Sequence, residues 1–363
     1  MAGALSRYRI VELGDQPAVA VLGMLLADQG AEVIKVEAPE GDPLRGVPVF
    51  SVWNRGKQSV VADPRSNKDR RGLQGLIRDA DVVIEGFDSG NNPYGIDYDT
   101  ARNEKLDIIH LRIPGLSQGG NVTASELIVS AATGVYADRS ADGSQGASFI
   151  ALPYASVFGA MVAAPAITAA LFHRERNGEG QSVVVPLYDS MFTAMGSAIV
   201  RRPDVPAGPG AMSPAIGRFY RCADDRWVNL NATYERSLRP MLTAMGHPDW
   251  YDALTDERLR ANIEEREEWA ARFAGVWLQK SAAEWEDMME DVGAPLTMCR
   301  TLREWMETDH AWQSGAVVEL DDPVYGPMRQ VGIQVRLEDT PGAIRGAAPA
   351  LGPSIIYPDE RER

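Results

Sequence analysis

The sequence predicts an α/β protein in which an open, doubly wound parallel sheet forms a large domain and a smaller α+β domain follows. Apolar segments of strand type alternate with helical segments over roughly the first 120 residues, which is typical of a parallel sheet with helices between its strands. The pattern changes near residue 200, where Pro and Gly accumulate. A length of 363 residues, 45% of them hydrophobic, suits two domains with substantial cores.

Hydrophobic patterning places the elements of the first domain. The strand candidates are short apolar segments at 9–13, 31–36, 59–62, 81–87 and 107–113. Residues 18–29 predict a helix, because their Val and Leu side chains share one side and Gly30 ends the pattern. A second helix covers 67–80, with Ser66 as its N-cap. Strands separated by helices imply right-handed connections, and therefore a Rossmann-like sheet.

Small and apolar residues dominate the next part of the chain. We expect helices at about 124–137 and 155–172, then a strand at 181–185 and a helix over Ser190. The uncharged stretch 143–172 is long enough to span a membrane. However, two prolines interrupt it, and half of its residues are Ala, Gly or Ser rather than Leu or Ile. We therefore interpret it as a buried core segment and expect no association with membranes.

A Pro- and Gly-rich segment, 201–217, is expected to link the large domain, 1–200, to a small domain, 218–324. Residues 219–230 predict a hairpin at the start of the small domain. Most of 234–311 shows the periodicity of amphipathic helices, and short strand patterns return after it.

Charge and cysteine content exclude several classes of protein. The formal net charge is 36 − 51 = −15, which argues against general nucleic-acid binding because that function needs a basic face. Cys222 and Cys299 are 77 positions apart, so they form no ligand cluster and we expect no metal. Two free cysteines suit a reducing compartment. The N-terminal residues lack the apolar core of a signal peptide, so we expect a cytoplasmic location.

Two short patterns bear on catalysis. The turn after the first strand, 14–17, contains one glycine, whereas the dinucleotide-binding fingerprint needs three. Residues 115–119 match the nucleophile pattern G-x-S-x-G, with Ser117 at its centre. That pattern requires a helix directly after it, and Gly120-Asn121 opposes one. Ser117 is therefore either the nucleophile of an ester or thioester hydrolase or part of a Gly/Ser surface loop.

Basic side chains occur where the predicted strands begin or end. They are Lys35, Arg45, Arg55, Lys57 and Arg112. Open α/β sheets bind ligands outside the carboxyl ends of their strands. A group of cations there, on an acidic protein, indicates a phosphate-bearing ligand. The alternative is that these residues are scattered surface charges.

Five sequence blocks carry a family resemblance. They are ADQGAEVIKVEAP (27–39), GDPLR (41–45), NRGKQS (54–59), ADVVIEGF (80–87) and RERNGEGQ (174–181). Weaker similarity continues through 292–295 and 348–352. Together, in this order and spacing, the blocks resemble the class III (CaiB/BaiF-type) CoA-transferases over nearly the whole chain.

The resemblance implies that the ligands are coenzyme A, as an acyl-CoA, and a carboxylic acid. It also implies that the C-terminal residues, here 325–363, complete the large domain. The expected assembly is a homodimer of two interlocked rings with active sites shared between subunits; a heteromer with a related subunit is the other possibility. Lys35, Arg55 and Lys57 match family positions near the nucleotide part of CoA.

The resemblance also indicates a catalytic position. Transferases of this family use an Asp at the start of a helix to attack the acyl-CoA thioester, which leads through a mixed anhydride to an enzyme–CoA thioester. Aligned on Ala131 and Gly134, residues 125–131 correspond to that block, and Glu126 takes the place of the Asp. Glu126 is therefore the candidate nucleophile. The alternative is an ordinary acidic residue in the first turn of a helix.

Other positions depart from the family's pattern. The racemase branch has a His and a second Asp where this chain has Ser125 and Ser156, and serine is neither an acid nor a base near neutral pH. We expect these serines to line the substrate pocket. Asp88 stands where the family has an Arg. Two functions besides CoA transfer stay open: a non-catalytic partner subunit, and altered acyl-CoA chemistry such as hydrolysis, isomerisation or a lyase reaction.

Overall fold

The computed structural model of the chain describes residues 2–87, 92–116, 125–137, 147–195, 215–232, 234–256 and 262–355. The chain divides into two compact units. The first comprises Met1–Arg139, Gly146–Val200 and Asp309–Arg363, and the second comprises Ser140–Gln145 and Arg201–Thr308. Both ends of the chain therefore belong to the first unit.

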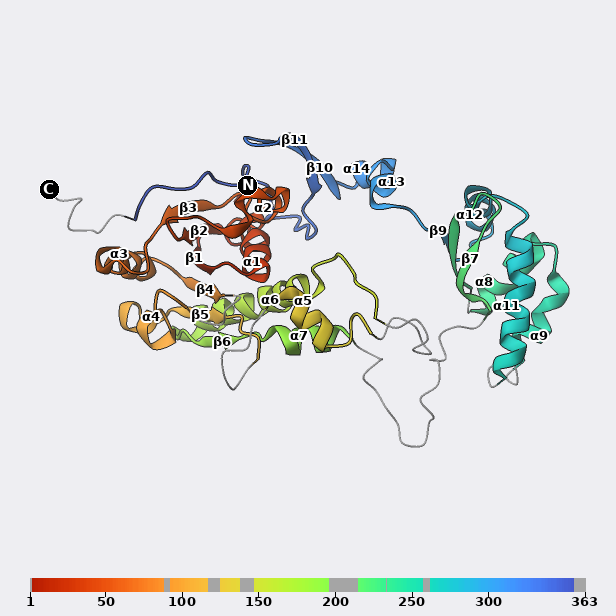
Figure 1. The fold of residues 1–363 in the computed structure, drawn as a ribbon, viewed down its shortest axis with the longest axis horizontal. Coiled ribbons are helices and arrows are strands. Elements are labelled where there is room, and N and C mark those ends of the chain that lie inside the picture. The colour runs from red at the N-terminus through yellow and green to blue at the C-terminus, as the bar shows by residue number, and fades with distance from the viewer. Residues whose placement is uncertain are drawn as a thin grey trace. The chain divides into compact units, whose positions relative to one another are not determined.

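A parallel sheet, six-stranded over the described residues, forms the centre of the first unit (Figure 1). Its strands are β1 (Arg9–Gly14), β2 (Glu32–Glu37), β3 (Gln58–Val61), β4 (Val82–Gly86), β5 (Ile109–Arg112) and β6 (Ser182–Val184). Their order is β3-β2-β1-β4-β5-β6. Val11 of β1 lies opposite Ile34 of β2 on one side and opposite Val83 of β4 on the other. The strand order therefore reverses between β1 and β4, and such a switch point is where open α/β sheets bind ligands.

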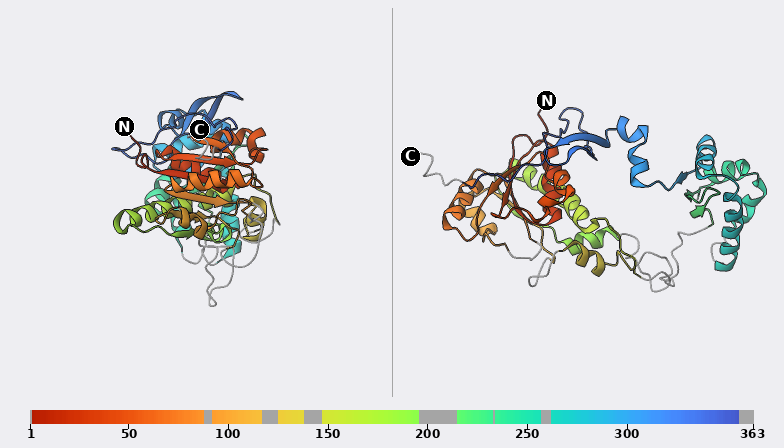
Figure 2. Two further views of the ribbon diagram at one scale, coloured as in Figure 1. Left: turned by 90° about the vertical axis from the view of Figure 1, so that its left-hand side faces the viewer. Right: turned by 45° about the horizontal axis from the view of Figure 1, so that its top comes forward.

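Helices cover both faces of this sheet (Figure 2). One layer contains α1 (Pro17–Asp28), α5 (Glu126–Ala132), α6 (Tyr154–Asn177) and α7 (Leu187–Ala194). The other contains α3 (Asn67–Arg78) and α4 (Tyr98–Glu104), and the short α2 (Pro48–Trp53) precedes β3. Alternate strand residues enter the two cores; for example, Ile10 packs in the α1 layer and Val11 in the α3 layer. The α/β fold with a parallel sheet, predicted from the sequence, is confirmed.

Capping residues and glycines set the ends of the helices, and the predicted length of one helix is wrong. The Ser66 side chain accepts a hydrogen bond from Asp69 N and caps α3, as predicted. The helix expected at 124–137 is only Glu126–Ala132. Gly134 follows at φ 91°, a backbone conformation that cannot continue an α-helix. Conversely, α6 extends beyond the predicted 172 to Asn177 and ends at Gly178, which adopts the left-handed conformation.

The helix α6 is long and apolar enough to cross a membrane by length and composition, the one such helix in the described part of the chain. Within the first unit it packs between α1 and α7. Gly159, Ala163 and Ile167 line its buried side. Its small residues allow close helix packing, because a Cβ at Gly159 would lie 2.5 Å from Leu187 Cδ2 of α7. The structure thus places it as a core helix, as expected from the sequence.

The C-terminal part of the chain returns to the first unit. It contributes α14 (Asp309–Gln313) and an antiparallel hairpin of β10 (Val317–Asp322) and β11 (Gly326–Val331). Beyond the hairpin, Ile355 N donates to Val61 O, and Ser354 forms a parallel bridge with Val61 next to β3. The boundary between the units falls after Thr308, whereas the sequence-based expectation was 324, because β10 alone does not show which core it joins.

The second unit is an antiparallel sheet packed on helices. Its strands are β7 (Gly217–Arg221), β8 (Trp227–Asn231) and β9 (Leu296–Met298), and its helices are α8 (Glu235–Ala244), α9 (Tyr251–Thr255), α11 (Ile263–Trp277), α12 (Ala282–Asp291) and α13 (Leu302–Met306). The predicted hairpin is the β7–β8 pair, and Asp225 in its turn has φ 62°. Trp277 and Trp285 meet edge to face at 4.8 Å in the core.

Candidate functional site

A cleft of about 350 Å³ opens at the switch point of the first unit. The carboxyl ends of β1, β2 and β4 form its base. Phe87, Tyr94 and Pro43 give it apolar walls, and Asp15 and Asp42 add acidic groups. Flat apolar walls with a few polar groups are typical of sites for small organic ligands.

One glycine sets the shape of this cleft. Gly14 has φ 148°, and a Cβ there would lie 1.9 Å from the carbonyl oxygen of Gly86 on β4. No other residue fits so close an approach of two strand ends. The turn after β1 therefore needs its single glycine for packing, although it lacks the dinucleotide fingerprint.

Two of the predicted cations, Lys35 and Lys57, are buried on either side of one carboxylate. Lys35 Nζ donates to Glu12 Oε1 at 3.0 Å and pairs with Asp42 Oδ2 at 2.8 Å. Lys57 Nζ donates to Glu12 Oε2 at 2.7 Å, to Ala20 O at 2.9 Å and to Asn54 Oδ1 at 3.0 Å. An ammonium group has three donors. Lys57 therefore has none left for a ligand.

Burial affects the pKa values of the two lysines differently. Burial, with Lys35 nearby, lowers the pKa of Lys57 to about 8 although Glu12 opposes this. Burial also acts to lower the pKa of Lys35, but the carboxylates of Glu12 and Asp42 outweigh it and hold that pKa above its usual value. Lys35 is thus firmly cationic, and it ties β1 and β2 to the Asp42 segment on the rim of the cleft.

Arg55 and Arg45 are also engaged in ion pairs. Arg55 is fully buried, with Nη2 donating to Asp28 Oδ2 at 2.6 Å. Arg45 donates through Nε and Nη2 to both oxygens of Glu37, at 2.7 and 2.5 Å. Arg45 and Ser59 offset the burial of Glu37 and lower its pKa. Arg45 thus fixes the Glu37 end of β2 at the cleft, whereas Arg55 ties the end of α1 to Val331 of β11.

Arg112, at the carboxyl end of β5, differs from the other four. Its side chain is exposed and forms no ion pair with any residue that the structure describes. Within the described part of the chain, it is the member of the predicted set for which no ion pair is found.

The Glu126 side chain has an unusual set of partners. Its Oε2 accepts from Ser156 N at 2.8 Å and from Ser156 Oγ at 2.7 Å. Its Oε1 accepts from Ser130 Oγ at 2.8 Å and from Ala155 N at 3.1 Å. Ala155 and Ser156 belong to the first turn of α6, whose own N-cap residue, Pro153, provides no side-chain acceptor. The carboxylate therefore lies at the positive end of the α6 dipole.

The Glu126 carboxylate is more exposed to solvent than the two serines that donate to it. Ser156 and Ser130 are each 1% exposed, whereas Glu126 is only partly buried. No Lys or Arg among the described residues pairs with Glu126. The arrangement is thus a partly exposed carboxylate that neutral donors hold in one orientation, with no described cation pairing with it.

Two other serines lie on or beside α5, the helix that carries Glu126. The Ser125 side chain makes no cap hydrogen bond for α5, although Ser125 is its N-cap residue. The sequence interpretation missed Ser130, which the four-residue spacing from Glu126 on one helix indicates. Ser117 and Asp88 lie outside the described residues.

The carboxylate and the cleft lie at the same edge of the sheet. In a parallel sheet, a helix that connects two strands begins at the carboxyl edge, and α6 precedes β6 in this way. One turn further into α6, Gly159 faces Ala18 in the first turn of α1, which follows the Gly14 turn of the cleft.

A second titratable pair lies at the ends of β4 and β5. His110 Nε2 is 3.6 Å from Glu85 Oε2, and His110 is 2% exposed. Burial raises the pKa of Glu85 to about 7 in spite of Arg112, and burial lowers the pKa of His110 to about 4 in spite of Asp97. Near neutral pH the imidazole is therefore uncharged and the carboxyl group is partly protonated.

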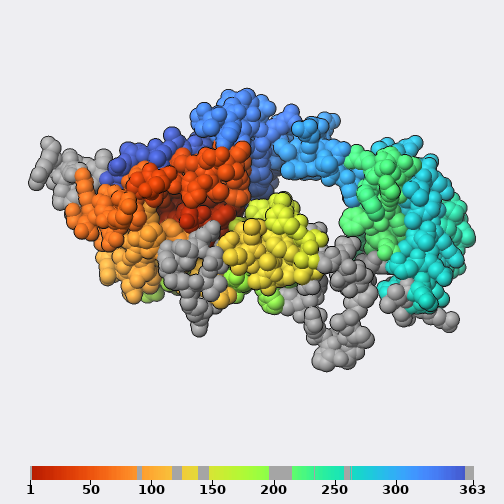
Figure 3. All heavy atoms as spheres, viewed as in Figure 1, coloured from red at the N-terminus to blue at the C-terminus, as the bar shows by residue number. Residues whose placement is uncertain are grey.

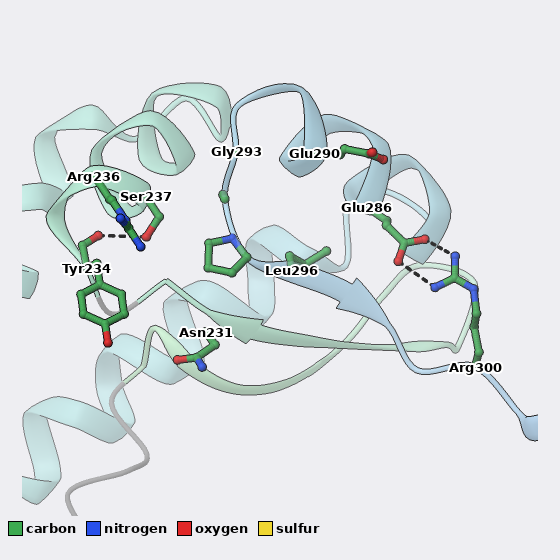
Figure 4. Close-up of a pocket in the computed structure, with 11 residues that line it drawn as sticks. Asn231, Tyr234, Arg236, Ser237, Glu286, Glu290, Gly293, Leu296 and Arg300 are labelled. Carbon is green, nitrogen blue, oxygen red and sulfur yellow. Dashed lines mark hydrogen bonds and ion pairs between the residues drawn. The ribbon is translucent and has the colours of Figure 1, made fainter. Parts of the chain in front are cut away.

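The second unit has a cavity of about 710 Å³ between α8, α12 and β9. Figure 4 shows Tyr234, Arg236 and Ser237 on one side and Glu286 paired with Arg300 on the other. Arg300 and Thr297 donate hydrogen bonds to the Glu286 carboxylate. The Arg300 bond is the main reason that the pKa of Glu286 is lowered to about 2. This carboxylate is neutralised by its partner, unlike Glu126, and offers no comparable nucleophile.

A family model for CoA-transferase family III matches residues 5–354. The chain therefore belongs to this family, as the sequence blocks indicated, and the family implies an acyl-CoA substrate. Among the described residues, no group of three His, Cys, Asp or Glu side chains is arranged to hold a metal ion.

Related proteins and structures agree with this assignment. The chain is 27% identical to succinyl-CoA–D-citramalate CoA-transferase of Chloroflexus aurantiacus, over 96% of this chain and 91% of that protein. It is also 27% identical to succinyl-CoA:mesaconate CoA-transferase of Haloarcula marismortui, over 96% and 94%. Its fold is similar to the crystal structure of Rv3272 from Mycobacterium tuberculosis, with a TM-score of 0.83 at 24% identity and coverage of 97% of both chains.

Proposed function

We propose that this protein transfers CoA from an acyl-CoA to a carboxylic acid, with the Glu126 carboxylate as the covalent nucleophile. The observation that carries the proposal is the environment of Glu126. Four neutral donors orient the carboxylate, the side chain remains accessible, and no described cation neutralises it. Membership of a CoA-transferase family supports the reaction class.

The chemistry requires only what this carboxylate can supply. One oxygen attacks the thioester carbonyl carbon and the thiolate leaves, which gives a mixed anhydride. The thiolate then attacks the Glu126 carboxyl carbon, so that the donor acid leaves and CoA is held as a thioester on the enzyme. The acceptor acid reverses these steps and departs as the new acyl-CoA. Precise placement matters, because a displacement of ~1 Å can lower such a rate about 100-fold.

The cleft at the switch point is the proposed site for the nucleotide end of CoA. Phe87 and Tyr94 line the cleft and offer flat surfaces for an adenine ring. Arg112 does not line the cleft; its exposed guanidinium, at the carboxyl end of β5, is the proposed contact for a phosphate group. In this proposal Lys35 and Arg45 hold the walls of the cleft through their pairs with Asp42 and Glu37. Arg55 and Lys57 make ion pairs outside the cleft lining. Calorimetry with CoA tests this: Tyr94→Ala and Arg112→Ala should weaken binding at least several-fold, and unchanged affinity in both would place CoA elsewhere.

The decisive test of the function is capture of the enzyme–CoA thioester. Succinyl-CoA is the first donor to use, because the names of the relatives mention it. Hydroxylamine or borohydride added during turnover, followed by peptide mapping, should mark Glu126. Glu126→Gln should give no marked peptide and no transfer. Full activity in Glu126→Ala would remove the assignment.

A specific observation favours a second function, that of a non-catalytic partner subunit. Two of the four hydrogen bonds, those from Ala155 N and Ser156 N, make Glu126 an N-terminal cap for α6, which is a purely structural role. A partner subunit would bind CoA without turnover, and activity would appear only when a related chain is added. Turnover by the purified single chain would exclude it.

A second copy of this chain is the proposed partner of the first unit. Leu127, Met161 and Phe192, from α5, α6 and α7, are large apolar side chains exposed on the helical layer. The segment that includes α5, yellow in Figure 3, lies at the surface. Exposed apolar groups of this kind mark association surfaces. Light scattering should give a dimer at micromolar concentration, which Met161→Glu should weaken; a monomer of the unaltered chain would contradict this.

A further inference from the structure

The two oxygens of the Glu126 carboxylate are held unequally. Ser156 alone supplies both donors to Oε2, through N at 2.8 Å and Oγ at 2.7 Å. Oε1 receives its donors from two different helices, Ser130 Oγ at 2.8 Å and Ala155 N at 3.1 Å. Shorter hydrogen bonds to an ionised group are the stronger ones. Each oxygen accepts two hydrogen bonds, but Oε2 depends on one residue, Ser156, for both of its donors.

We propose that Ser156 is a positioning residue that fixes Oε2, leaves Oε1 as the attacking atom and stabilises negative charge on Oε2 when the carboxyl carbon is attacked. This inference rests on the proposed function. Ser156 does not reach the substrate in this scheme, because its side chain is 1% exposed and its hydroxyl donates to Glu126 Oε2; it acts through the carboxylate.

The charge arises in a defined step. An Oε1 electron pair attacks the thioester carbon, and the C–S bond breaks with its pair going to the thiolate. The thiolate then attacks the carbon of the Glu126 carboxyl group, a C–S bond forms, and the electron pair of the C=Oε2 bond moves onto Oε2. The tetrahedral adduct collapses when the bond to Oε1 breaks, so the donor acid leaves as a carboxylate that contains Oε1. No proton is transferred.

The first turn of α6 suits this task. Two preorganised donors on one developing oxyanion are the usual means by which enzymes stabilise such adducts. The N–H of Ser156 also lies at the positive end of a 24-residue helix. Since both donors are already in place around the resting carboxylate, little reorganisation accompanies the step.

The chain provides a matched control. Ser130 is the same residue type, equally buried, and bonded to the other oxygen. Ser156→Ala and Ser130→Ala each remove one hydroxyl from the same carboxylate and should lower the melting temperature similarly. Only Ser156→Ala removes a donor from the oxyanion of the thioester-forming step.

The experiment compares both variants with the unaltered protein and with Ser156→Thr, using succinyl-CoA and rapid quenching. Ser156→Ala should lower kcat and the rate of thioester formation by about 10- to 100-fold with KM for the donor nearly unchanged, since single oxyanion donors contribute ~10²–10³-fold and the backbone donor remains. Ser130→Ala should lose clearly less, and Ser156→Thr, which keeps the hydroxyl, should recover most of the rate.

The outcomes separate the two proposals. Equal rate losses in the two alanine variants, or a loss confined to KM, would overturn the role of Ser156 while the adduct on Glu126 still forms. Absence of any adduct in the unaltered protein would remove the proposed function, and the role of Ser156 with it. A Ser156→Ala protein that is unfolded leaves the decision to Ser156→Thr, which must then keep most of the activity.

Discussion

Two carboxylates in the first unit, Glu12 and Glu126, have opposite surroundings: the described donors to Glu12 are two ammonium groups, and those to Glu126 are four neutral groups. Glu12 is fully buried between two ammonium groups, those of Lys35 and Lys57. Glu126 is accessible, and all of its described donors are neutral hydroxyl or backbone N–H groups. The first carboxylate balances charge in the core, and the second presents charge at the surface.

The difference explains why a basic cluster in the sequence is not in itself a phosphate site. A cation beside a buried carboxylate is already neutralised and has few donors left. A carboxylate held by neutral donors keeps its full charge in a fixed position, which favours reaction. Four predictions, in order of decreasing effect, test whether the two sites differ as described.

The largest effect on stability should come from Glu12→Gln. The variant leaves Lys35 and Lys57 buried without their shared carboxylate, and breaking a buried ion pair on one side typically costs ~3–5 kcal/mol. Urea unfolding measures the free energy. The double variant Glu12→Met/Lys57→Met should recover part of the loss; a loss below ~1 kcal/mol in Glu12→Gln would show that the cluster is solvated in solution.

Glu85 should make stability fall as pH rises. Its pKa is about 7 in the folded protein against an ordinary value of 4.5. Between these values the folded state keeps a proton that the unfolded state has lost, so the free energy of unfolding decreases with pH. The shift corresponds to up to ~3 kcal/mol at 1.36 kcal/mol per unit.

The uncharged variant Glu85→Gln isolates this effect from that of His110. Relative to the unaltered protein, Glu85→Gln should become more stable by up to ~3 kcal/mol as pH rises from 5 to 8. Denaturant unfolding at the two pH values measures the difference. A difference that does not change with pH would mean that Glu85 ionises normally in the fold.

Replacing a glycine beside the cluster of Glu12, Lys35 and Lys57 should have a smaller, steric effect on stability. In Gly23→Ala the new Cβ would lie 2.0 Å from Glu12 Oε2 and 2.9 Å from Lys57 Nζ. Overpacking of this kind costs ~1–3 kcal/mol. Gly275 of α11 is the control, since a Cβ there meets nothing within 4 Å, and Gly275→Ala should stabilise by ~0.5–1 kcal/mol. If both variants change the melting temperature by the same small amount, the side chains of Glu12 and Lys57 can move to accept the new methyl group.

The smallest stability effect is expected for Glu126→Gln. The amide oxygen of Gln can still accept from the first turn of α6. The NH₂ group replaces the other oxygen and faces hydrogen-bond donors, which should lower the free energy of unfolding by ~1 kcal/mol. Thermal melting measures it. A much larger destabilisation, with transfer activity retained, would assign Glu126 to capping and favour the partner-subunit function.

The sequence was sufficient for elements whose patterns are local. Strands such as β1 and β4, the Ser66 cap and the hairpin β7–β8 depend on residues within one element. The length of α5 was overestimated because Gly134 ends the helix early, and small-residue patterns do not show where a backbone turns.

The chemistry of the candidate site was only partly predictable, because its partners are distant in sequence. Glu126 was identified from its block, but its contact with Ser156 spans 30 residues. The pairing of Lys57 with Glu12 spans 45 residues. Such pairs depend on how helices and strands meet in space, so sequence indicated the cations and could not show that they were already neutralised.

The most direct measurement is a crystal structure of the protein soaked with coenzyme A. The account predicts the CoA sulfur within about 3.5 Å of the Glu126 carboxyl group, the distance of a reactive contact, with the adenine end in the cleft beside Tyr94. A sulfur that lies beside a different carboxylate, with Glu126 still only capping α6, would contradict it.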